Sequence, residues 1–456
     1  MSANSKKNAN LNPRTTSYEF LGPPGALFIT LAVPLTIYGL YFGCSEETGG
    51  CPPPNFSTYP DRITLALSNP TFWKGLWDSK ATAIYFGWYA FCVAAWAVLP
   101  GAEIEGTTMR TGEKKRYKIN ALSTFLLALG ITSGIIYNYG PGAFTFLYER
   151  WVGFATASIL MATLQAIGVY VMSFREGKLL ALGGNSGNFI YDFYIGRELN
   201  PSIGSFDIKS FNELRPGLIL WTLIDISMAC EQAVRRGGLA NVTDSMWLVL
   251  LFQIGYVADA LYNEPAIFTT MDITTDGFGF MLSIGDLAWV PFVYSLQARY
   301  LAFNQRELGP VLTGLIFLVN GVGYYIFRAS NGEKNDFRNG INPKNLQYFT
   351  TERGSKLLTS GWWGRSRHPN YLQVTTIAPS RQYSLPSSYS GDLLMALAWS
   401  LPTGFETPIT YFYVTYFTVL LVHRQRRDDE NCEKKYGKDW EKYKKMVPYR
   451  IVPYVY

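Results

Sequence analysis

The chain has 456 residues, of which 48% are hydrophobic, 16% are aromatic and 16% are charged. Soluble domains carry about 25% charged residues, so this deficit indicates that lipid surrounds much of the chain. The net charge of +6 is small for this length and the basic residues lie in loops, which excludes nucleic acid as a partner.

The few histidines and cysteines exclude several classes of metal enzyme. His368 and His423 cannot supply the many ligands of a membrane di-iron desaturase, and neither lies in an HxxxH or HxxH box. The cysteines contain no CxxC pair, which argues against zinc, so we expect no metal. Cys44 and Cys51 bracket the loop CSEETGGC. A disulfide between them is an open alternative that depends on the loop facing an oxidising lumen.

Apolar runs predict the membrane topology. The polar N-terminus lacks the pattern of a removable signal peptide. Each full run approaches the ~20 residues that a helix needs to cross the hydrocarbon. The runs lie at residues 24–43, 81–99, 119–137, 152–173, 217–233, 246–263, 279–303, 309–328, 391–402 and 405–422. They predict an all-α, polytopic integral membrane protein with about ten transmembrane helices, about eight being the lower bound.

The loops between these runs predict the orientation. With the N-terminus in the cytosol, the loops at 101–118 and 174–216 face the cytosol and are rich in lysine and arginine. The two luminal loops then carry the glycosylation sequons that begin at Asn55 and Asn241, although the second also carries two arginines. Both termini are therefore expected in the cytosol.

Acidic residues recur inside or beside the apolar runs. They are Asp225, Glu231, Asp259, Glu264, Asp272, Asp276 and Asp286. Ionisable groups at membrane depth are costly and face a cavity or a partner. Each one alone is equally compatible with a helix cap or an interhelical hydrogen bond, but the set indicates a lined cavity.

Two basic residues after the eighth run suggest an anion site. Lys334 and Arg338 share one face if the segment is helical. Like charges there repel each other unless an anion lies between them. A 2′-phosphate suits the pair, because arginine offers a bidentate fork and lysine a point charge. The alternative is a solvated basic cluster beside the membrane.

The C-terminal region is dense in rings and hydrogen-bonding groups. The segment LLTSGWWGRSRHPNY at 357–371 suits stacking on a flat ring and binding an amide, an interfacial aromatic belt being the alternative. The tail at 421–456 interleaves aromatic rings with mixed charge, and Arg424 and Asp428 are one helical turn apart. Since neither GxGxxG after a strand nor GxxxxGK[ST] occurs, a nucleotide would be bound in a non-Rossmann pocket between helices.

Long motifs give a family resemblance over nearly the whole chain. They are LNPRTTSYEF, GNFIYDFYIGRELNP, DALYNEPAIFTTMDITTDGFGFML, GDLAWVPFVYSLQARYL, SGWWGRSRHPNYL and KKYGKDWEKYKKMVPYRIVPYVY. These motifs resemble the sterol reductase family, which includes the sterol C14 reductases, the 7-dehydrocholesterol reductases, the sterol C24(28) reductases and the lamin B receptor. The first motif and GRELNP are most similar to a fungal C14 reductase, that is, a delta(14)-sterol reductase.

The resemblance implies an NADPH-dependent, multi-pass enzyme of the endoplasmic reticulum membrane. Its expected reaction is reduction of the C14–C15 double bond of a sterol intermediate in ergosterol-type biosynthesis. An isolated C=C bond is a poor hydride acceptor, so protonation comes first and hydride is then delivered to C14. The expected partners are the sterol, the lipid bilayer and other enzymes of sterol biosynthesis.

The resemblance also implies site residues and a division of the chain. The expected NADPH pocket is lined by Lys334, Arg338, Leu357, Trp363, Asn370, Tyr371, Asp392, Arg424, Asp428, Cys432, Glu433, Lys434, Lys435, Tyr436 and Tyr443. Tyr256 and Asp428 match the candidate catalytic pair of the family. We expect a cytosolic N-terminal segment at 1–20, transmembrane helices with the sterol cavity at 21–328, and an NADPH-binding part at 329–456.

One departure from the family pattern lies inside the expected pocket. The family runs RHPNYL directly into GDLLMALAWSLP, whereas Gln373–Ser390 (QVTTIAPSRQYSLPSSYS) separates them here. The segment has the composition of a loop and its boundaries are clean on both sides. Translation of an unspliced intron is the preferred interpretation, and a real cytosolic loop is the alternative.

Other functions remain open at this point. Within the family, the reduced bond could instead be at C7 or C24(28), because cavity shape decides which bond is reduced. A membrane methyltransferase of the isoprenylcysteine type also ends in an RHPxY segment and an acidic, aromatic tail, but such enzymes are shorter. A scaffold like the lamin B receptor would carry an extra nucleoplasmic domain, and only about 20 polar residues precede the first expected helix here.

Overall fold

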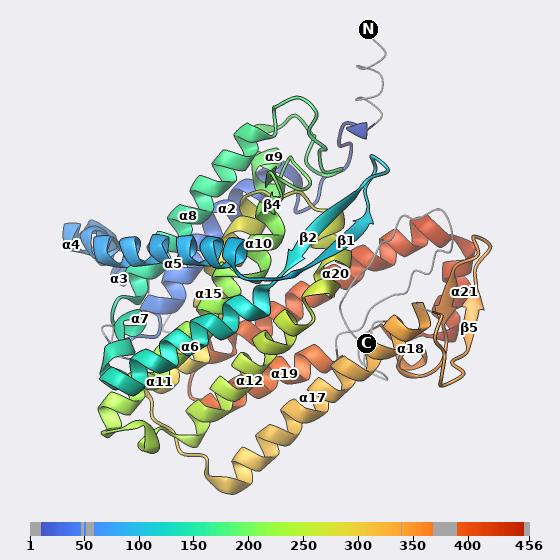
Figure 1. Cartoon of the computed structure of the whole chain (residues 1–456). Helices are drawn as coiled ribbons and strands as arrows, with labels where there is room; N and C mark the ends of the chain where they lie inside the picture. Colours follow the sequence, from blue (N-terminus) through green and yellow to red (C-terminus); the bar gives the residue numbers. More distant parts are fainter. Residues whose placement is uncertain (1–10, 47–49, 52–58, 339, 368–389, 451–456) are drawn as a thin grey trace. The chain divides into compact units, whose positions relative to one another are not determined.

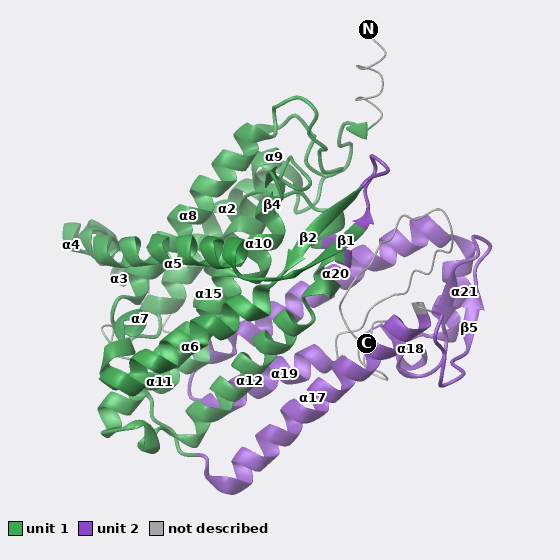
Figure 2. Cartoon of the chain, viewed as in Figure 1, with its two compact units in different colours: residues 1–106, 114–268, 272–307 green, residues 107–113, 269–271, 308–456 purple. Residues whose placement is uncertain are grey.

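The chain is described here by a computed structural model that covers residues 11–46, 50–51, 59–338, 340–367 and 390–450 (Figure 1). It is mostly helical and divides into two compact units (Figure 2). Unit 1 comprises residues 1–106, 114–268 and 272–307, and unit 2 comprises residues 107–113, 269–271 and 308–456.

In the described part of the chain before residue 308, six helices of 19 to 22 residues are connected by shorter helices and two ribbons. The helices are α2 (Gly22–Phe42), α3 (Tyr59–Ser68), α4 (Pro70–Gly75), α5 (Ser79–Val98), α6 (Ala121–Tyr139), η2 (Pro141–Phe144), α7 (Phe146–Glu149), α8 (Trp151–Met172), α9 (Phe189–Ile195), α10 (Ile208–Leu214), α11 (Pro216–Arg236), η3 (Leu239–Asn241), α12 (Asp244–Tyr262), η4 (Glu264–Thr269), α13 (Met271–Thr274), α14 (Phe280–Ile284), the π-helical turn η5 (Gly285–Trp289), α15 (Val290–Val293) and α16 (Leu296–Phe303). The strands are β1 (Ala102–Thr108), β2 (Lys114–Ile119), β3 (Ser202–Ile203) and β4 (Phe206–Asp207).

The elements from residue 308 onward include the C-terminal charged tail. They are α17 (Gly309–Arg338), β5 (Tyr348–Thr350), β6 (Lys356–Leu358), α18 (Trp362–Arg365), α19 (Ser390–Ser400), η6 (Leu401–Thr403), η7 (Ile409–Tyr411), α20 (Phe412–Tyr436) and α21 (Lys438–Met446).

Seven helical segments among the described residues are long and apolar enough to cross a membrane. They are Gly22–Phe42, Pro70–Val98, Ala121–Tyr139, Trp151–Met172, Ile208–Arg236, Asp244–Tyr262 and Gly309–Phe337. Each coincides with one of the expected apolar runs, so the prediction of a polytopic membrane protein is confirmed. The count of ten and the orientation stay predictions.

The three other expected spans are helical but interrupted or short. The run at 279–303 is divided among α14, η5, α15 and α16, and 391–402 corresponds largely to the 11 residues of α19. The run at 405–422 enters α20, whose second half carries the charged tail. Glycine and proline at 285 and 291 accompany the breaks in the first of these.

The described residues also form three two-stranded β-ribbons, so the fold is mostly helical rather than all-α as predicted. The ribbons are β1–β2, β3–β4 and β5–β6. The first occupies the basic loop at 101–118, where Tyr117 is buried and stacks on Phe268 with ring centroids 4.1 Å apart. The prediction for this loop used only its basic residues. The alternation of inward and outward side chains, which is typical of a strand, is the pattern that indicates the ribbon.

The most buried of the described spanning segments of unit 1 is Ile208–Arg236, which contains α11 and has 15 buried residues in that helix. Proline begins α11, and Gly237 ends it in the left-handed conformation with φ of +80°. A Cβ at Gly217 would lie 1.7 Å from the Asp286 carbonyl oxygen, so only glycine allows α11 to approach η5 this closely.

A buried ion pair anchors the N-terminal end of α11. The Arg215 guanidinium donates to the Glu264 carboxylate at 2.9 Å and to the Asn120 side-chain oxygen at 2.8 Å. The other Glu264 oxygen accepts the backbone N–H of Ala121 at 2.8 Å. Arg215 and Glu264 are 2% and 1% exposed, so the pair ties α11 to the start of α6 without access to water.

The other end of α11 is tied to the loop that begins at Cys44. Cys44 and Cys51 form a disulfide, the alternative left open by the sequence. Arg235 donates bidentately to Glu46 at 2.6 and 2.7 Å, and the Tyr148 hydroxyl donates to the same carboxylate at 2.6 Å. The neighbouring Arg236 pairs with a glutamate as well. The two arginines in the expected luminal loop are therefore compensated by acidic partners.

The N-terminal motif, residues 11–20, contacts residues 178–191 in unit 1, a stretch that leads into the second motif. The side chain of Asn12 donates to the Lys178 carbonyl and accepts the Leu180 N–H, both at 2.9 Å. Further along, the Glu19 N–H donates to the Tyr191 hydroxyl at 3.0 Å. The N-terminal motif is thus a structural clasp on the segment that contains α9.

In unit 2, glycines allow two helices to pack closely. A Cβ at Gly323 of α17 would lie 2.9 Å from the Gly391 carbonyl oxygen of α19. Small residues at such positions let helix backbones approach, as is common between membrane helices. On the other side of α19, Leu393 packs against Leu421 of α20. These contacts fix the positions from which the C-terminal tail emerges.

Replacing Glu264 with glutamine should strongly destabilise the protein. It would leave the buried Arg215 charge uncompensated, which costs about 3–5 kcal/mol. The midpoint of thermal unfolding in detergent should fall clearly. The control is Glu307→Gln at the more exposed ion pair with Arg236, where the change should stay within about 1 kcal/mol. Equal shifts in the two variants would contradict the structural role of the buried pair.

The contact between Glu46 and Arg235 should depend on pH. Hydrogen bonding to Arg235 lowers the pKa of Glu46 from 4.5 to about 2. The stabilisation is therefore complete above pH 4.5 and is lost as the pH falls from 4.5 toward 2. The midpoint difference between the wild type and Glu46→Gln should be constant above pH 5 and shrink below about pH 4.5. A difference that is unchanged at pH 2 would refute this assignment.

Candidate functional site

The end of α17 carries a buried lysine above an indole. Lys334 is 3% exposed, and its Nζ lies 5.0 Å from the centroid of the Trp363 ring. Trp363 is fully buried and donates its Nε1–H to the Ser330 carbonyl at 3.0 Å. One turn later, the Glu333 carboxylate accepts the Trp362 N–H at 3.0 Å. Two hydrogen bonds therefore hold α18 against α17 and set the indole beside the ammonium group.

Trp363 belongs to a buried cluster that joins five segments of unit 2. Its members come from the end of α17, strand β6, α18, the end of α20 and α21. They are Phe337, Leu357, Leu358, Trp363, Tyr436, Trp440, Tyr443 and Val447, with Cys432 packed against them. Burial of so many rings makes this cluster the core of the C-terminal region.

Hydrogen bonds fasten the β5–β6 ribbon to α21. Phe349 pairs with Leu357 in the antiparallel register. The Tyr443 hydroxyl donates to the Leu358 carbonyl at 3.0 Å, and the Asp439 carboxylate accepts the Glu352 N–H at 2.7 Å. The ribbon and α21 therefore form one body around the buried rings.

One face of α20 leads from the apolar half of the helix into this cluster. Leu421, Gln425, Asp428 and Tyr436 are buried, and Cys432 is half-buried on the same face. Their spacing of three or four residues is that of a single helical face. Gln425 is 0% exposed, and neither atom of its amide has a hydrogen-bond partner among the described residues. Buried polar groups without a partner are rare and call for an explanation, such as a ligand.

Arg367 ties the segment after α18 to the tail. Its guanidinium donates to Asp429 at 3.1 Å and to the Pro448 carbonyl at 3.3 Å, and its N–H donates to the Tyr449 carbonyl at 2.9 Å. Arg367 is 3% exposed. The chain is thus fixed up to the residue before His368.

Burial dominates the electrostatics of this region. It raises the pKa of the Cys432 thiol, an effect to which Asp428 and Asp429 add and which Lys435 and Lys334 oppose. It likewise raises the pKa of Tyr443 and lowers that of Lys435. The thiol is therefore neutral at physiological pH and serves as a packing group rather than a nucleophile.

The expected cofactor residues fall into three groups. Lys334, Leu357, Trp363, Cys432, Tyr436 and Tyr443 lie in or directly beside the buried cluster. Asp428 and Asp392 are buried on α20 and α19, Arg424 and Lys435 are half-buried, and Glu433 and Lys434 are exposed. Asn370, Tyr371 and the segment 373–389 lie outside the described residues, as does the side chain of Arg338, although its backbone ends α17.

The expected catalytic tyrosine lies in unit 1. Tyr256 is half-buried on α12, with its ring centroid 6.2 Å from that of Trp221 on α11. Trp221 donates to Gln253 at 3.0 Å, and Gln253 donates in turn to the Tyr294 carbonyl at 3.1 Å. This network holds the indole against the tyrosine ring.

The acidic residues of the apolar segments have separate environments. Glu264 pairs with Arg215, and Glu231 pairs with Arg235 one turn along α11. Asp225 is 0% exposed, and neither of its oxygens has a hydrogen-bond partner in the described part of the chain. None of the acids lines the cavity found in unit 1, whose walls are apolar. For Glu264, whose partners lie at the starts of α11 and α6, the interhelical alternative is the correct one, whereas Glu231 pairs within its own helix.

Gln425 and Ser330 were not expected from the sequence. The helical spacing from Leu421 to Asp428 already places Gln425 on the inward face, so periodicity alone could have indicated it. Ser330 contributes through its backbone carbonyl, and no side-chain pattern reveals such a role.

Comparison with known proteins gives consistent matches over the full length. The Ergosterol biosynthesis ERG4/ERG24 family matches residues 14–456. The chain is 47% identical over 443 residues to Delta(14)-sterol reductase erg24 of Schizosaccharomyces pombe, covering 96% of this chain and 97% of that protein. It is 40% identical over 475 residues to Delta(14)-sterol reductase ERG24 of Saccharomyces cerevisiae, covering 98% and 99%. It is 42% identical over 451 residues to Delta(14)-sterol reductase TM7SF2 of Mus musculus, covering 96% and 97%.

Removing the Tyr443 hydroxyl should loosen the β5–β6 ribbon. Tyr443→Phe leaves the buried Leu358 carbonyl without its donor, which costs about 1–3 kcal/mol. Hydrogen exchange of the β6 amides should accelerate accordingly. Tyr348→Phe on β5, where the ring is 42% exposed, is the matched control and should leave exchange unchanged. Unchanged exchange in Tyr443→Phe would show that this hydrogen bond does not secure the ribbon.

Proposed function

The chain belongs to the Ergosterol biosynthesis ERG4/ERG24 family, and from this premise we propose that it is an NADPH-dependent delta(14)-sterol reductase. The relatives that match it over nearly their whole length carry that name. The proposed reaction reduces the C14–C15 double bond of a sterol intermediate. The proposed setting is the endoplasmic reticulum membrane, with ten transmembrane helices and both termini in the cytosol.

One structural observation carries the cofactor proposal. A buried lysine, a buried tryptophan and a buried amide come from three different segments of unit 2, and the lysine acts electrostatically on the same thiol as Asp428. The buried Lys334 ammonium group would attract a phosphate more strongly than an ammonium group in water does. The Gln425 amide has no hydrogen-bond partner among the described residues, and such a buried amide is costly unless a ligand binds it. A phosphorylated dinucleotide supplies both kinds of partner.

The residues present fit this cofactor. Lys334, with Arg338 one turn later on α17, would bind the 2′-phosphate that distinguishes NADPH from NADH. Trp363 offers an indole face for stacking, and Gln425 offers a donor and an acceptor to the nicotinamide amide. Asn370, Tyr371, Asp392, Arg424, Glu433, Lys434, Lys435, Tyr436 and Tyr443 complete the proposed pocket. When bound, NADPH supplies the hydride.

The residues of the chain supply acid and charge. Protonation of the double bond creates positive charge at C14, which needs a proton donor and a nearby anion. Tyr256 is the proposed donor, because its phenol on α12 lies beside Trp221 of α11, with the ring centroids 6.2 Å apart. Asp428 is the proposed anion, because a buried carboxylate stabilises a developing cation more strongly than one in water.

A substrate panel tests the proposal directly. The purified full chain, and a second version lacking 373–390, would receive NADPH with a Δ8,14 diene, a Δ5,7 diene or a Δ24(28) sterol. Reduction of the Δ8,14 diene alone is the expected result. Reduction of either other sterol would reassign the bond within the family. Binding of S-adenosylmethionine rather than NADPH would favour the methyltransferase. Activity only without 373–390 would favour the intron interpretation.

Lys334→Met should impair the use of NADPH selectively. Loss of a charge-assisted hydrogen bond costs about 1.5–3 kcal/mol, so KM for NADPH should rise about 10- to 150-fold while KM for NADH changes little. Lys344→Met is the matched control, because that lysine pairs with Glu333 and its side chain is 60% exposed. An equal rise for both cofactors would remove Lys334 from 2′-phosphate recognition.

Tyr256→Phe should abolish turnover while leaving the protein folded and able to bind NADPH. Removal of a general acid typically lowers the rate by about 10²–10⁴-fold. Tyr262→Phe, at the end of the same helix and 73% exposed, is the control and should keep full activity. The readouts are single-turnover rate and NADPH affinity. A normal rate in Tyr256→Phe would exclude this residue as the donor.

A further inference from the structure

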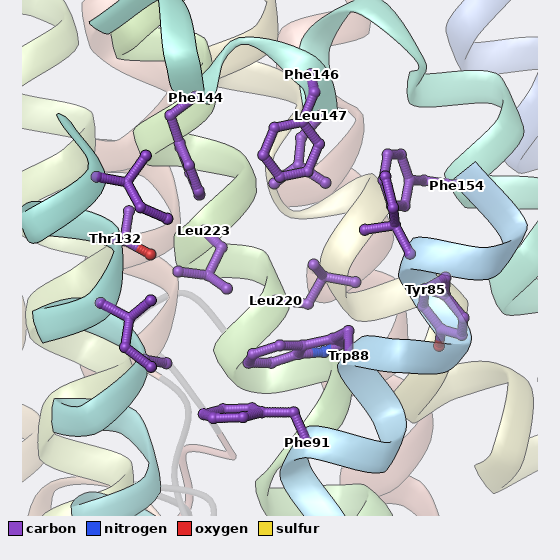
Figure 3. A pocket seen from close by; sticks show the side chains of 14 residues that line it. Tyr85, Trp88, Phe91, Thr132, Phe144, Phe146, Leu147, Phe154, Leu220 and Leu223 are labelled. Atoms are coloured by element: carbon purple, nitrogen blue, oxygen red, sulfur yellow. The ribbon is translucent and has the colours of Figure 1, made fainter. Parts of the chain in front are cut away.

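Unit 1 contains a cavity among its membrane-spanning helices (Figure 3). It lies between α5, α6, α8 and α11, with η2 and α7 closing one end. Its empty volume is about 650 Å³, counted to its open mouth. The part of it that water-sized molecules can fill is about 190 Å³, below the range of about 300–1,000 Å³ that is usual for small-molecule sites, so a larger ligand would extend through the open mouth.

The walls of the cavity are hydrocarbon, apart from one hydroxyl group that is available to a ligand. The two other polar side chains of the lining are already engaged, because Trp88 donates to the Pro216 carbonyl at 3.0 Å and Tyr85 donates to the Leu287 carbonyl at 3.4 Å. Figure 3 shows the Thr132 hydroxyl directed into the cavity. No charged residue belongs to the lining. A ligand with a charged or strongly polar body therefore has no partner here.

The cavity reaches the surface on the side of α6. Ile131 lines the cavity and is 46% exposed, and Leu127, one turn before it on α6, is 39% exposed. Both α5 and α6 belong to segments long and apolar enough to cross a membrane. The mouth therefore opens on surface that the bilayer covers, and the ligand is a molecule that dissolves in the bilayer.

The shape of the walls favours a rigid ring system. Trp88 and Phe91 stack at one end with centroids 5.5 Å apart and an interplanar angle of 26°. Phe144 and Phe146 lie at the other end with centroids 5.2 Å apart, and leucines of α11 lie between (Figure 3). A fused-ring ligand contacts both ends with little loss of conformational entropy, whereas an acyl chain has to freeze many bonds.

The cavity is on a different face of α11 from Tyr256. Leu220 and Leu223 line the cavity, whereas Trp221 contacts Tyr256 and Tyr294. Successive residues on a helix are about 100° apart, so the helix separates the two environments. A molecule in the cavity would contact the back of the helix that positions the proposed proton donor.

We propose that this cavity is a second binding site for a 3-hydroxy sterol of the membrane, distinct from the site of reduction. The ring system would lie between the two aromatic ends and the hydroxyl would bond to Thr132. Only the choice of a sterol among rigid membrane lipids rests in part on the proposed function. The site itself rests on the cavity, its single free hydroxyl and its mouth in the bilayer.

Photolabelling of the full chain tests the site without turnover. A diazirine sterol with a free 3-hydroxyl would be bound in nanodiscs without NADPH, and labelled peptides would be mapped by mass spectrometry. Label should appear on α5, α6 and α11 and be competed by unlabelled ergosterol. Equal competition by phosphatidylcholine would show an acyl-chain site and overturn the proposal, as would absence of label from these helices.

Variants of α6 separate this site from the reaction. Ala128→Phe fills the cavity and should weaken its labelling at least about tenfold, or 1.4 kcal/mol. Leu126→Phe adds the same ring to the lipid-facing surface and should label normally. Thr132→Val should weaken the 3-hydroxy probe about 2- to 12-fold but not its 3-deoxy analogue.

Turnover of the Δ8,14 diene distinguishes the two sites. If the Ala128→Phe variant folds, loses labelling of the cavity and still reduces the diene at saturating concentration, the result supports a second site. Loss of both labelling and substrate binding in this folded variant would make the cavity the substrate site and overturn the proposal. Unchanged labelling of the cavity peptides would also overturn it. If the wild type does not reduce the diene but its cavity is still labelled, the result would refute only the proposed function.

Discussion

The burial of α11 is the constraint on which the N-terminal unit depends. A helix surrounded by other helices in lipid gains little from the hydrophobic effect, so packing and satisfied polar groups have to hold it. Arg215 and Glu264 supply this at one end, and Arg235 with Glu46 supplies it at the other. Gly217 lets the backbone of η5 approach between them. The elements around α11 therefore take their positions from it.

This arrangement gives α11 two chemically different faces. One face presents Trp221 to a network of tyrosine and glutamine side chains on α12 and beyond. Another presents leucines to a cavity with aromatic ends and a single available hydroxyl. Because the interior is close-packed, a change of side-chain packing on one face of α11 is transmitted to the other face.

In the C-terminal unit, polar and charged groups are held beside buried aromatic rings. Trp363 is fixed to the Ser330 carbonyl, Tyr443 to the Leu358 carbonyl, and Arg367 to Asp429 and the tail backbone. Lys334 is buried beside Trp363, and the buried amide of Gln425 has no hydrogen-bond partner in the described part of the chain, a cost that a ligand would offset. The proposed cofactor and the packing of the cluster are thus aspects of one arrangement.

The sequence by itself determined the polytopic class, the positions of the seven apolar runs that coincide with spanning helices, and the family, because each depends on local composition or on contiguous motifs. It could not determine that Arg215 meets Glu264, that the basic loop at 101–118 forms a ribbon, or that the Gln425 amide is buried with no partner among the described residues. Nor could it reveal a cavity whose walls come from α5, α6, α8 and α11. These features depend on which faces of distant helices pack together, and spacing along one segment does not encode that choice.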